Sequence, residues 1–197
     1  MQFQFEQDKA IQAMGFIVGR LKSVNKVKLM KLVYLADKTH FLRAGYPITG
    51  DRQRALPYGP VPSGTLDVLN GNIWPDPEAA YKFLHVDDNT VTLRHDPGLD
   101  RLSAEEVATL DQVLQLYGKD APWGPGGLVE QTHDLPEYQE AFAGAVQRGA
   151  KSAPIPYESI LKHAGDESHY RLNRPVASSA TVPHLLCPLN AGADADL

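Results

Sequence analysis

Two ionisable residues, Asp37 and His40, interrupt an apolar stretch in the first quarter of the chain. Residues three apart on a helix share one face, so this pair could supply an acid and a base to an active site, together with His133. No nucleophile or metal motif accompanies them, and a buried ionisable group needs a partner wherever it lies. We therefore favour a structural pair that ties its helix to the loop at 50–64 or to a later segment. Thr132 and His133 are likewise expected to fix the loop before the next helix.

Histidines in the last third of the chain are the candidates for a metal site. A zinc site needs closely spaced pairs of ligands that converge on one point. Four possible ligands fall within 25 residues, namely His163, His169, His184 and Cys187. Only the H-x-x-C at 184–187 supplies such a pair, so we favour solvated or packed histidines and predict no metal.

The sequence lacks the common motifs of catalysis and of cofactor binding. GPGG at 124–127 has no following lysine and threonine, so it is not a phosphate-binding loop. The patterns G-x-S-x-G, H-E-x-x-H and G-x-G-x-x-G do not occur. A lone cysteine in a proline-rich tail, Cys187, is a poor candidate for a nucleophile. We predict a protein that is not an enzyme and binds no cofactor.

Composition and charge narrow the classes of partner. The 197 residues are 43% hydrophobic and carry a net charge of −5. This charge argues against direct binding of nucleic acid and suits a basic protein partner. Charged residues occupy the start of the chain, and the longest uncharged run there, 10–19, is too short for a membrane span of ~20 residues. We expect a cytoplasmic protein with no membrane partner.

A helix at about 26–44 is the predicted centre of the fold. Asn25 is a plausible N-cap and Gly45 a plausible stop. Apolar residues cover more than half of its circumference, which predicts burial by several neighbours, including a helix at 5–22. The lysines on the remaining arc, Lys28, Lys31 and Lys38, are expected to face water.

The other patterns predict a fold of class α+β, mainly α-helical, with a small hairpin or sheet. Extended segments are expected at about 53–58, 81–86 and 90–95, the last two forming a hairpin on the helices or beside 53–58. Ser63 is expected to cap a short helix, and Ser103 with Glu106 forms a capping box. Further helices should begin at Pro136 and Pro156, with a turn at 23–25 and a linker at 148–156. We expect one domain over 1–170 and a loosely structured tail over 171–197.

Three blocks of the sequence together resemble one known family. They are KLMKLVYLADKTHFLRAGYPITGDRQRALPYGPVPS at 28–63, LSAEEVATLDQVLQLYG at 102–118 and LVEQTHDLPEYQEA at 128–141. In order and spacing they are similar to the Panacea domain of SocA-like antitoxins, over roughly residues 5–165. Tyr138 stands where the family often has tryptophan.

This resemblance implies a bacterial or phage antitoxin of the type II class, which neutralises a cognate protein toxin by direct binding. It implies a mostly helical core with a small β element, and no chemistry. For the SocA branch it also implies a proteolytic adaptor that delivers the toxin to the ClpXP protease. The tail from 171 onward would then be the candidate for contact with the protease.

We expect the partner to bind at the rim of the first block. A buried cluster of apolar and aromatic side chains would supply most of the affinity. The five candidates are Tyr34, Tyr46, Tyr58, Pro60 and Val61. Core packing is the alternative for each of them, and it is the stronger one for Tyr34 and Val61.

Overall fold

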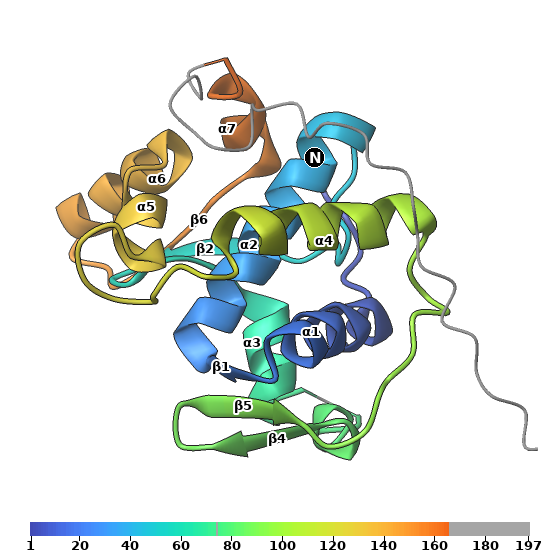
Figure 1. Ribbon diagram of the computed structural model, residues 1–197. Helices are drawn as coiled ribbons and strands as arrows, with labels where there is room; N and C mark the ends of the chain where they lie inside the picture. Colours follow the sequence, from blue (N-terminus) through green and yellow to red (C-terminus); the bar gives the residue numbers. More distant parts are fainter. Residues whose placement is uncertain (74, 166–197) are drawn as a thin grey trace, which may run out of the picture.

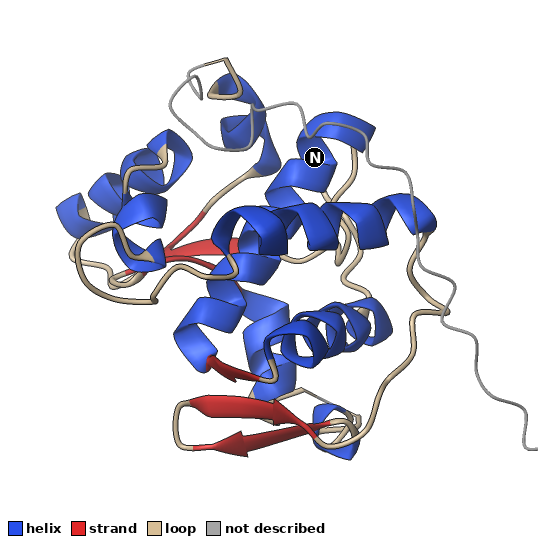
Figure 2. Ribbon diagram, in the orientation of Figure 1, coloured by secondary structure: helices blue, strands red, loops and turns tan. Residues whose placement is uncertain are grey.

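Helices form the larger part of the secondary structure, and two small antiparallel sheets flank them (Figures 1 and 2). The computed structural model describes residues 1–73 and 75–165, so the predicted tail at 171–197 lies outside it. The helices are α1 (Gln7–Leu21), α2 (Lys26–Ala44), α3 (Ser63–Leu69), the 3-10 turn η1 (Ala80–Lys82), α4 (Ala104–Tyr117), α5 (Leu128–His133), α6 (Pro136–Gln147) and α7 (Tyr157–Lys162). The strands are β1 (Ser23–Asn25), β2 (Gln53–Leu56), β3 (Gly59–Pro62), β4 (Leu84–Asp87), β5 (Thr90–Leu93) and β6 (Ala153–Pro154). The predicted class, α+β and mainly helical, is confirmed.

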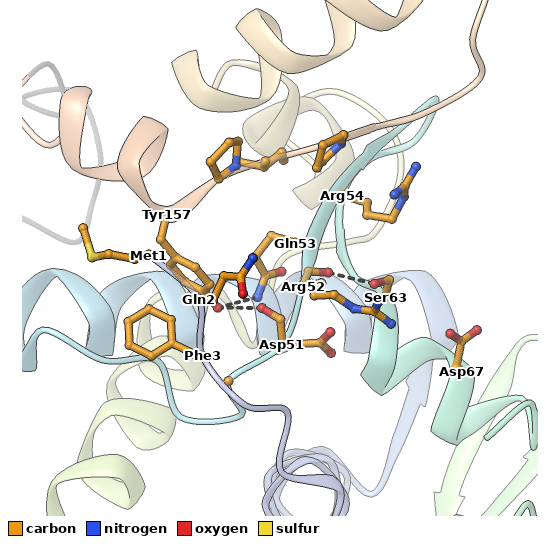
Figure 3. Close-up of a pocket in the computed structure, with 14 residues that line it drawn as sticks. Met1, Gln2, Phe3, Asp51, Arg52, Gln53, Arg54, Ser63, Asp67 and Tyr157 are labelled. Carbon is orange, nitrogen blue, oxygen red and sulfur yellow. Dashed lines mark hydrogen bonds between the residues drawn. The ribbon is translucent and has the colours of Figure 1, made fainter. Parts of the chain in front are cut away.

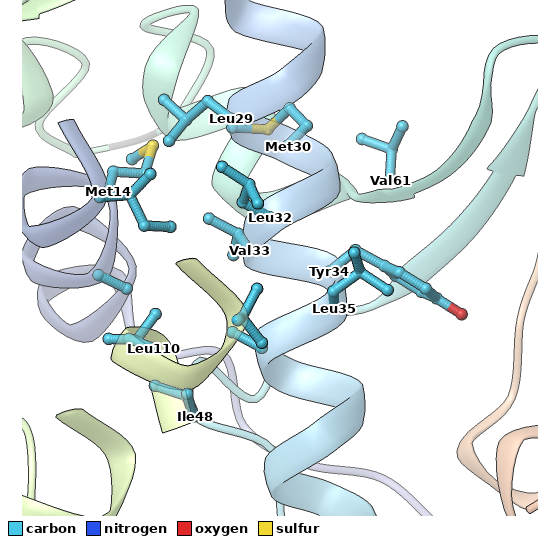
Figure 4. Packing of buried hydrophobic residues seen from close by; sticks show 14 of the residues in the cluster. Met14, Leu29, Met30, Leu32, Val33, Tyr34, Leu35, Ile48, Val61 and Leu110 are labelled. Carbon is cyan, nitrogen blue, oxygen red and sulfur yellow. The ribbon is translucent and has the colours of Figure 1, made fainter. Parts of the chain in front are cut away.

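Helix α2 runs through the middle of the fold, as its apolar arc predicts. The Asn25 side chain accepts a hydrogen bond of 2.9 Å from the amide of Val27, and Gly45 ends the helix with a φ of 84°. Every residue from 29 to 41 is buried, because α1, α4, α5 and β3 all contact the helix. Figure 4 shows its side chains extending toward α1 and α4 on one side and toward β3 on the other.

The prediction that the α2 lysines face water is wrong for two of the three. Lys31 and Lys38 are 0% and 1% exposed. The Lys31 ammonium donates to the carbonyl of Pro60 at 2.8 Å, and Lys38 binds Glu137 of α6. A helix surrounded on all sides has no solvated arc, so its cations must find acceptors inside the protein. Lys28, which is half-buried, donates to the carbonyl of Gly118.

The first sheet has the order β1-β5-β4. Of the two predicted placements of the hairpin, the one on the helices is confirmed, because β5 contacts α1, and the one beside 53–58 is wrong. The segment 23–25, expected to be a turn, is a strand in which Val24 pairs with Val91. The hairpin of β4 and β5 therefore lies against the junction between α1 and α2 and does not join the 53–58 segment. A hairpin alone is only marginally stable in water and needs a third strand or a helix to pack on. The extended connection between α1 and α2 supplies that third strand by pairing with β5.

The second sheet has the order β3-β2-β6. Residues Pro57 and Tyr58 form the turn between β2 and β3. The prolines of β3 are tolerated because this strand is at the edge of the sheet. The predicted linker at 148–156 contains β6, in which Ala153 pairs with Ala55. A strand of two residues is too short to show a periodic pattern in the sequence, so it is recognised only by its pairing with β2.

Capping follows the prediction at α4 and departs from it at α3. Ser103 and Glu106 form the expected capping box. At α3, however, Ser63 donates its hydroxyl to the carbonyl of Arg52, and the carboxylate of Asp51 caps the helix. Asp51 accepts from the amides of residues 64 and 65 at 2.7 and 2.6 Å, and from the Thr65 hydroxyl.

Candidate partner-binding site

Asp37 ties α2 to the loop that follows it. Its carboxylate accepts hydrogen bonds from the amide and the hydroxyl of Thr49, at 2.9 and 2.5 Å, and from the side-chain amide of Gln53 at 3.0 Å. Asp37 is 1% exposed, and burial raises its pKa to about 7. The carboxylate is thus fully engaged in holding the loop in place.

His40 binds the same loop at a different point. Its Nδ1 lies 2.8 Å from the carbonyl oxygen of Tyr46, and because a carbonyl only accepts, Nδ1 must carry the proton. The Tyr46 ring packs edge-on against the imidazole, with the centroids 4.7 Å apart. No hydrogen bond or ion pair joins Asp37 to His40 within the part of the chain that the structure describes. Each residue anchors the loop separately.

Thr132 and His133 lie on the other side of α2, where β3 begins. A Cβ atom added to Gly59 would lie 2.7 Å from Lys31 Nζ, 2.9 Å from Thr132 Oγ1 and 3.1 Å from His133 Cδ2, so these side chains crowd the start of the strand. The His133 ring stacks on Tyr138 with a centroid distance of 4.9 Å. Burial, and then the nearby charge of Lys31, lower the pKa of His133.

A cleft of about 650 Å³ lies beside β2 and the start of α7 (Figure 3). Arg52, Arg54 and Tyr157 are among the residues that line it, and Asp37, His40 and His133 are not. An enzyme built on the last three residues would require at least two of them to face one pocket. Asp37 and His40 instead bind separate points of one loop and His133 stacks on Tyr138, which gives this alternative no support.

The five predicted partner-binding residues divide into two groups. Tyr34 is 0% exposed and donates its hydroxyl to Glu137 at 2.7 Å, while Pro60 and Val61 are also buried. Tyr46 and Tyr58 are 42% and 62% exposed. Only these two can touch a partner without rearrangement of the core.

A comparison with families of known proteins decides the affiliation of the chain. The model of the family described as "antitoxin SocA-like, Panacea domain" matches residues 29–138, which is more than half of the chain. The chain belongs to this family. No curated protein and no solved structure matches it. Membership supports an antitoxin role and a toxin as partner.

The Panacea match begins within α2 and ends within α6, so it includes both sides of the candidate site. It includes the loop held by Asp37 and His40, the β2–β3 turn with Tyr58, and the segment containing Thr132 and His133. It also contains Trp123, which sequence analysis did not single out. Trp123 is 46% exposed and packs edge-on against Tyr58.

The histidines weighed as zinc ligands lie near the end of the described chain or beyond it. Of the four possible zinc ligands, His163 alone lies within residues 1–73 and 75–165, where no cluster of histidine, cysteine and acidic side chains could hold a metal. His163 lies 3.0 Å from a carboxylate oxygen of Glu140. In the same ranges, no helix is both long enough and apolar enough to cross a membrane.

Proposed function

We propose that this Panacea domain neutralises a cognate protein toxin by direct, stoichiometric binding. One observation supports binding over catalysis. In the first block, Asp37 and His40 are hydrogen-bonded within the chain, whereas two aromatic side chains are exposed. Asp37 and His40 hold the loop that carries Tyr46, and Tyr58 lies in the turn between β2 and β3.

The mechanism would be occlusion of the toxin's active surface. Tyr46 follows the C-terminal end of α2, and Tyr58 is in the turn between β2 and β3. Large aromatic side chains on a rigid frame lose little conformational entropy on binding, so they supply affinity efficiently. Tyr34, Pro60 and Val61 would act from the interior by fixing the shape of this frame.

The test is co-expression with the neighbouring open reading frame, with growth and pull-down as the two measurements. We expect the neighbour's product to arrest growth alone, and to become harmless and co-purify with this chain when both are expressed. The matched variants are Tyr46→Ala and Tyr58→Ala, with Leu161→Ala, an exposed residue of α7, as the control. A neighbour that never affects growth would remove the neutralisation proposal.

Delivery of the toxin to ClpXP would add a step to the same binding function. No feature of residues 1–73 and 75–165 favours it, so it is not part of the proposal. Its test is deletion of 171–197, which should slow degradation of the toxin while leaving binding intact.

A further inference from the structure

Tyr58 and Trp123 form an exposed aromatic pair from two segments far apart in the sequence. Their ring centroids are 5.2 Å apart and the rings are nearly perpendicular, at 89°. They are 62% and 46% exposed, the first at the β2–β3 turn and the second in the connection between α4 and α5. Tryptophan and tyrosine are, with arginine, the residue types enriched at the hot spots of protein interfaces.

Buried side chains form hydrogen bonds to the backbone on both sides of the turn that carries Tyr58. On one side of the turn, the Tyr138 hydroxyl donates to the carbonyl of Leu56 at 2.9 Å. On the other side, the Lys31 ammonium donates to the carbonyl of Pro60 at 2.8 Å. Two anchors that flank the turn fix its position, so Tyr58 is placed before any partner arrives.

The loop that carries Trp123 is also braced, despite its glycines and prolines. The amides of Leu128 and Val129 donate to the carbonyls of residues 121 and 122, on the N-terminal side of Trp123. On its C-terminal side, Glu130 accepts from the amide of Gly126, and the Gln131 side chain donates to the carbonyl of the same glycine. A partner would therefore meet two aromatic rings that are already positioned, which lowers the entropic cost of binding.

The segment that carries Trp123 has mostly negative charges, and the buried Lys31 lies under the turn that carries Tyr58. Between 119 and 134 the chain has one lysine, Lys119, and three carboxylates, Asp120, Glu130 and Asp134. His133 does not offset them at neutral pH, because its pKa is lowered. The whole chain has the same sign, with a net charge of −5. This field would attract a basic surface and repel an acidic one.

We propose that Tyr58 and Trp123 together are the anchor of the toxin interface, and that the toxin presents an apolar recess with lysine or arginine at its rim. This inference rests on the proposed function and adds to it the binding centre and the chemistry of the partner. Trp123 would fill the recess with Tyr58 packed against its edge, while the carboxylates of 120–134 face the basic rim.

The first experiment measures binding of the purified wild-type chain and its variants to the purified product of the neighbouring open reading frame. We expect Tyr58→Ala and Trp123→Ala each to weaken binding at least about 30-fold, since an anchor residue of an interface contributes ~2 kcal/mol or more. The double variant should lose less than the product of the two factors, because the rings touch each other. Leu161→Ala is the control for loss of an exposed apolar side chain. Circular dichroism of each variant should match that of the wild type.

The second experiment tests the charge of the partner. Asp134→Lys should lower the association rate, and added salt should lower the wild-type rate, because the carboxylates steer a basic surface. Asp87→Lys changes a carboxylate that is also exposed, on the β4–β5 hairpin, and should have little effect.

The outcomes separate this inference from the proposed function. If the wild type neutralises the toxin and both aromatic variants bind within threefold of it, the anchor is elsewhere and the antitoxin role stands. If the wild-type chain neither binds nor neutralises the neighbour's product, both proposals fall. If sedimentation shows that the wild type self-associates and Trp123→Ala does not, the pair serves a second copy of this chain and the toxin assignment is overturned.

Discussion

The Nζ atom of Lys38 lies 2.7 Å from Oε1 of Glu137, and both side chains are buried, at 1% and 0% exposed. The Tyr34 hydroxyl donates to the same oxygen at 2.7 Å. The contact joins α2 to the first turn of α6, which is about 100 residues later in the chain. It therefore links the beginning and the end of the matched Panacea segment.

Removal of one member of this buried pair should be strongly destabilising. Glu137→Ala leaves the Lys38 ammonium without its carboxylate, and the expected loss is about 3–5 kcal/mol in the free energy of unfolding. Urea unfolding followed by circular dichroism measures it. Glu105→Ala, an exposed carboxylate on α4, should change the stability by less than about 1 kcal/mol.

The double variant Lys38→Met/Glu137→Leu is the complementary control. It replaces both charges with apolar groups, so it should recover most of the loss seen in Glu137→Ala. A single variant as stable as the wild type would mean that Lys38 reaches another acceptor or water, and that the pair is not a support of the core.

Local signals in the sequence predicted the main elements well. The Asn25 cap, the Gly45 stop and the capping box at Ser103 and Glu106 are short-range patterns with a single geometric outcome, and all three are confirmed. The burial of α2 follows from the width of its apolar arc. The caps depend only on residues within one turn of each other and the arc on one helix alone, so no tertiary information is needed.

The features that sequence analysis missed depend on distant partners. The positions of Lys31 and Lys38 were misjudged because their acceptors, at residues 60 and 137, lie on other elements. β1 and β6 have three residues and two, which is too few for a period to show. At the candidate site, Tyr58 was predicted because it lies in the family motif. Trp123 stands alone in a loop of glycine and proline, and its contact with Tyr58 is visible only in three dimensions.

Asp37 should make the stability of the protein depend on pH. Its pKa is raised to about 7 in the folded state, from an ordinary value of 3.8, so the folded protein binds the extra proton between these values. The contribution of Asp37 to stability is therefore fully present below pH 3.8 and is lost as the pH rises through 7. The difference in unfolding free energy between wild type and Asp37→Asn should fall over this range, with a slope of up to about 1.4 kcal/mol per pH unit.

Lys31 should make stability depend on pH in the opposite direction to Asp37, so it serves as a control. Burial lowers its pKa to about 7 from 10.5, so its contribution is present above pH 10.5 and is lost as the pH falls through 7. The difference between wild type and Lys31→Met should accordingly rise from pH 7 to 10. If the Asp37→Asn difference is flat between pH 4 and 8, the carboxyl is not titrating in the interior.

Asp51 should matter more to α3 than Ser63, the residue at which the sequence placed the cap. Asp51→Ala removes three hydrogen bonds at the helix N-terminus and leaves buried amides without an acceptor, so we expect a loss of about 2 kcal/mol. Ser63→Ala removes one exposed bond and should cost less than about 0.5 kcal/mol. Thermal unfolding of the two variants measures the difference, and equal losses would show that Asp51 is not the effective cap.

Alanine substitutions at Gly59 and Gly124 separate two costs, the strain of the backbone and the steric clash with the side chains that pack under the Tyr58 turn. Both have a φ of 92°, so alanine at either position carries the cost of a left-handed conformation, about 1–2 kcal/mol. At Gly124 the added methyl meets nothing within 4 Å, whereas at Gly59 it meets Lys31 and Thr132 below 3 Å. Gly59→Ala should therefore lose at least about 1 kcal/mol more than Gly124→Ala in urea unfolding. The excess arises because the methyl must displace the Lys31 ammonium from the carbonyl of Pro60. Equal losses at the two glycines would mean that this lysine yields freely and that it does not fix the turn that carries Tyr58.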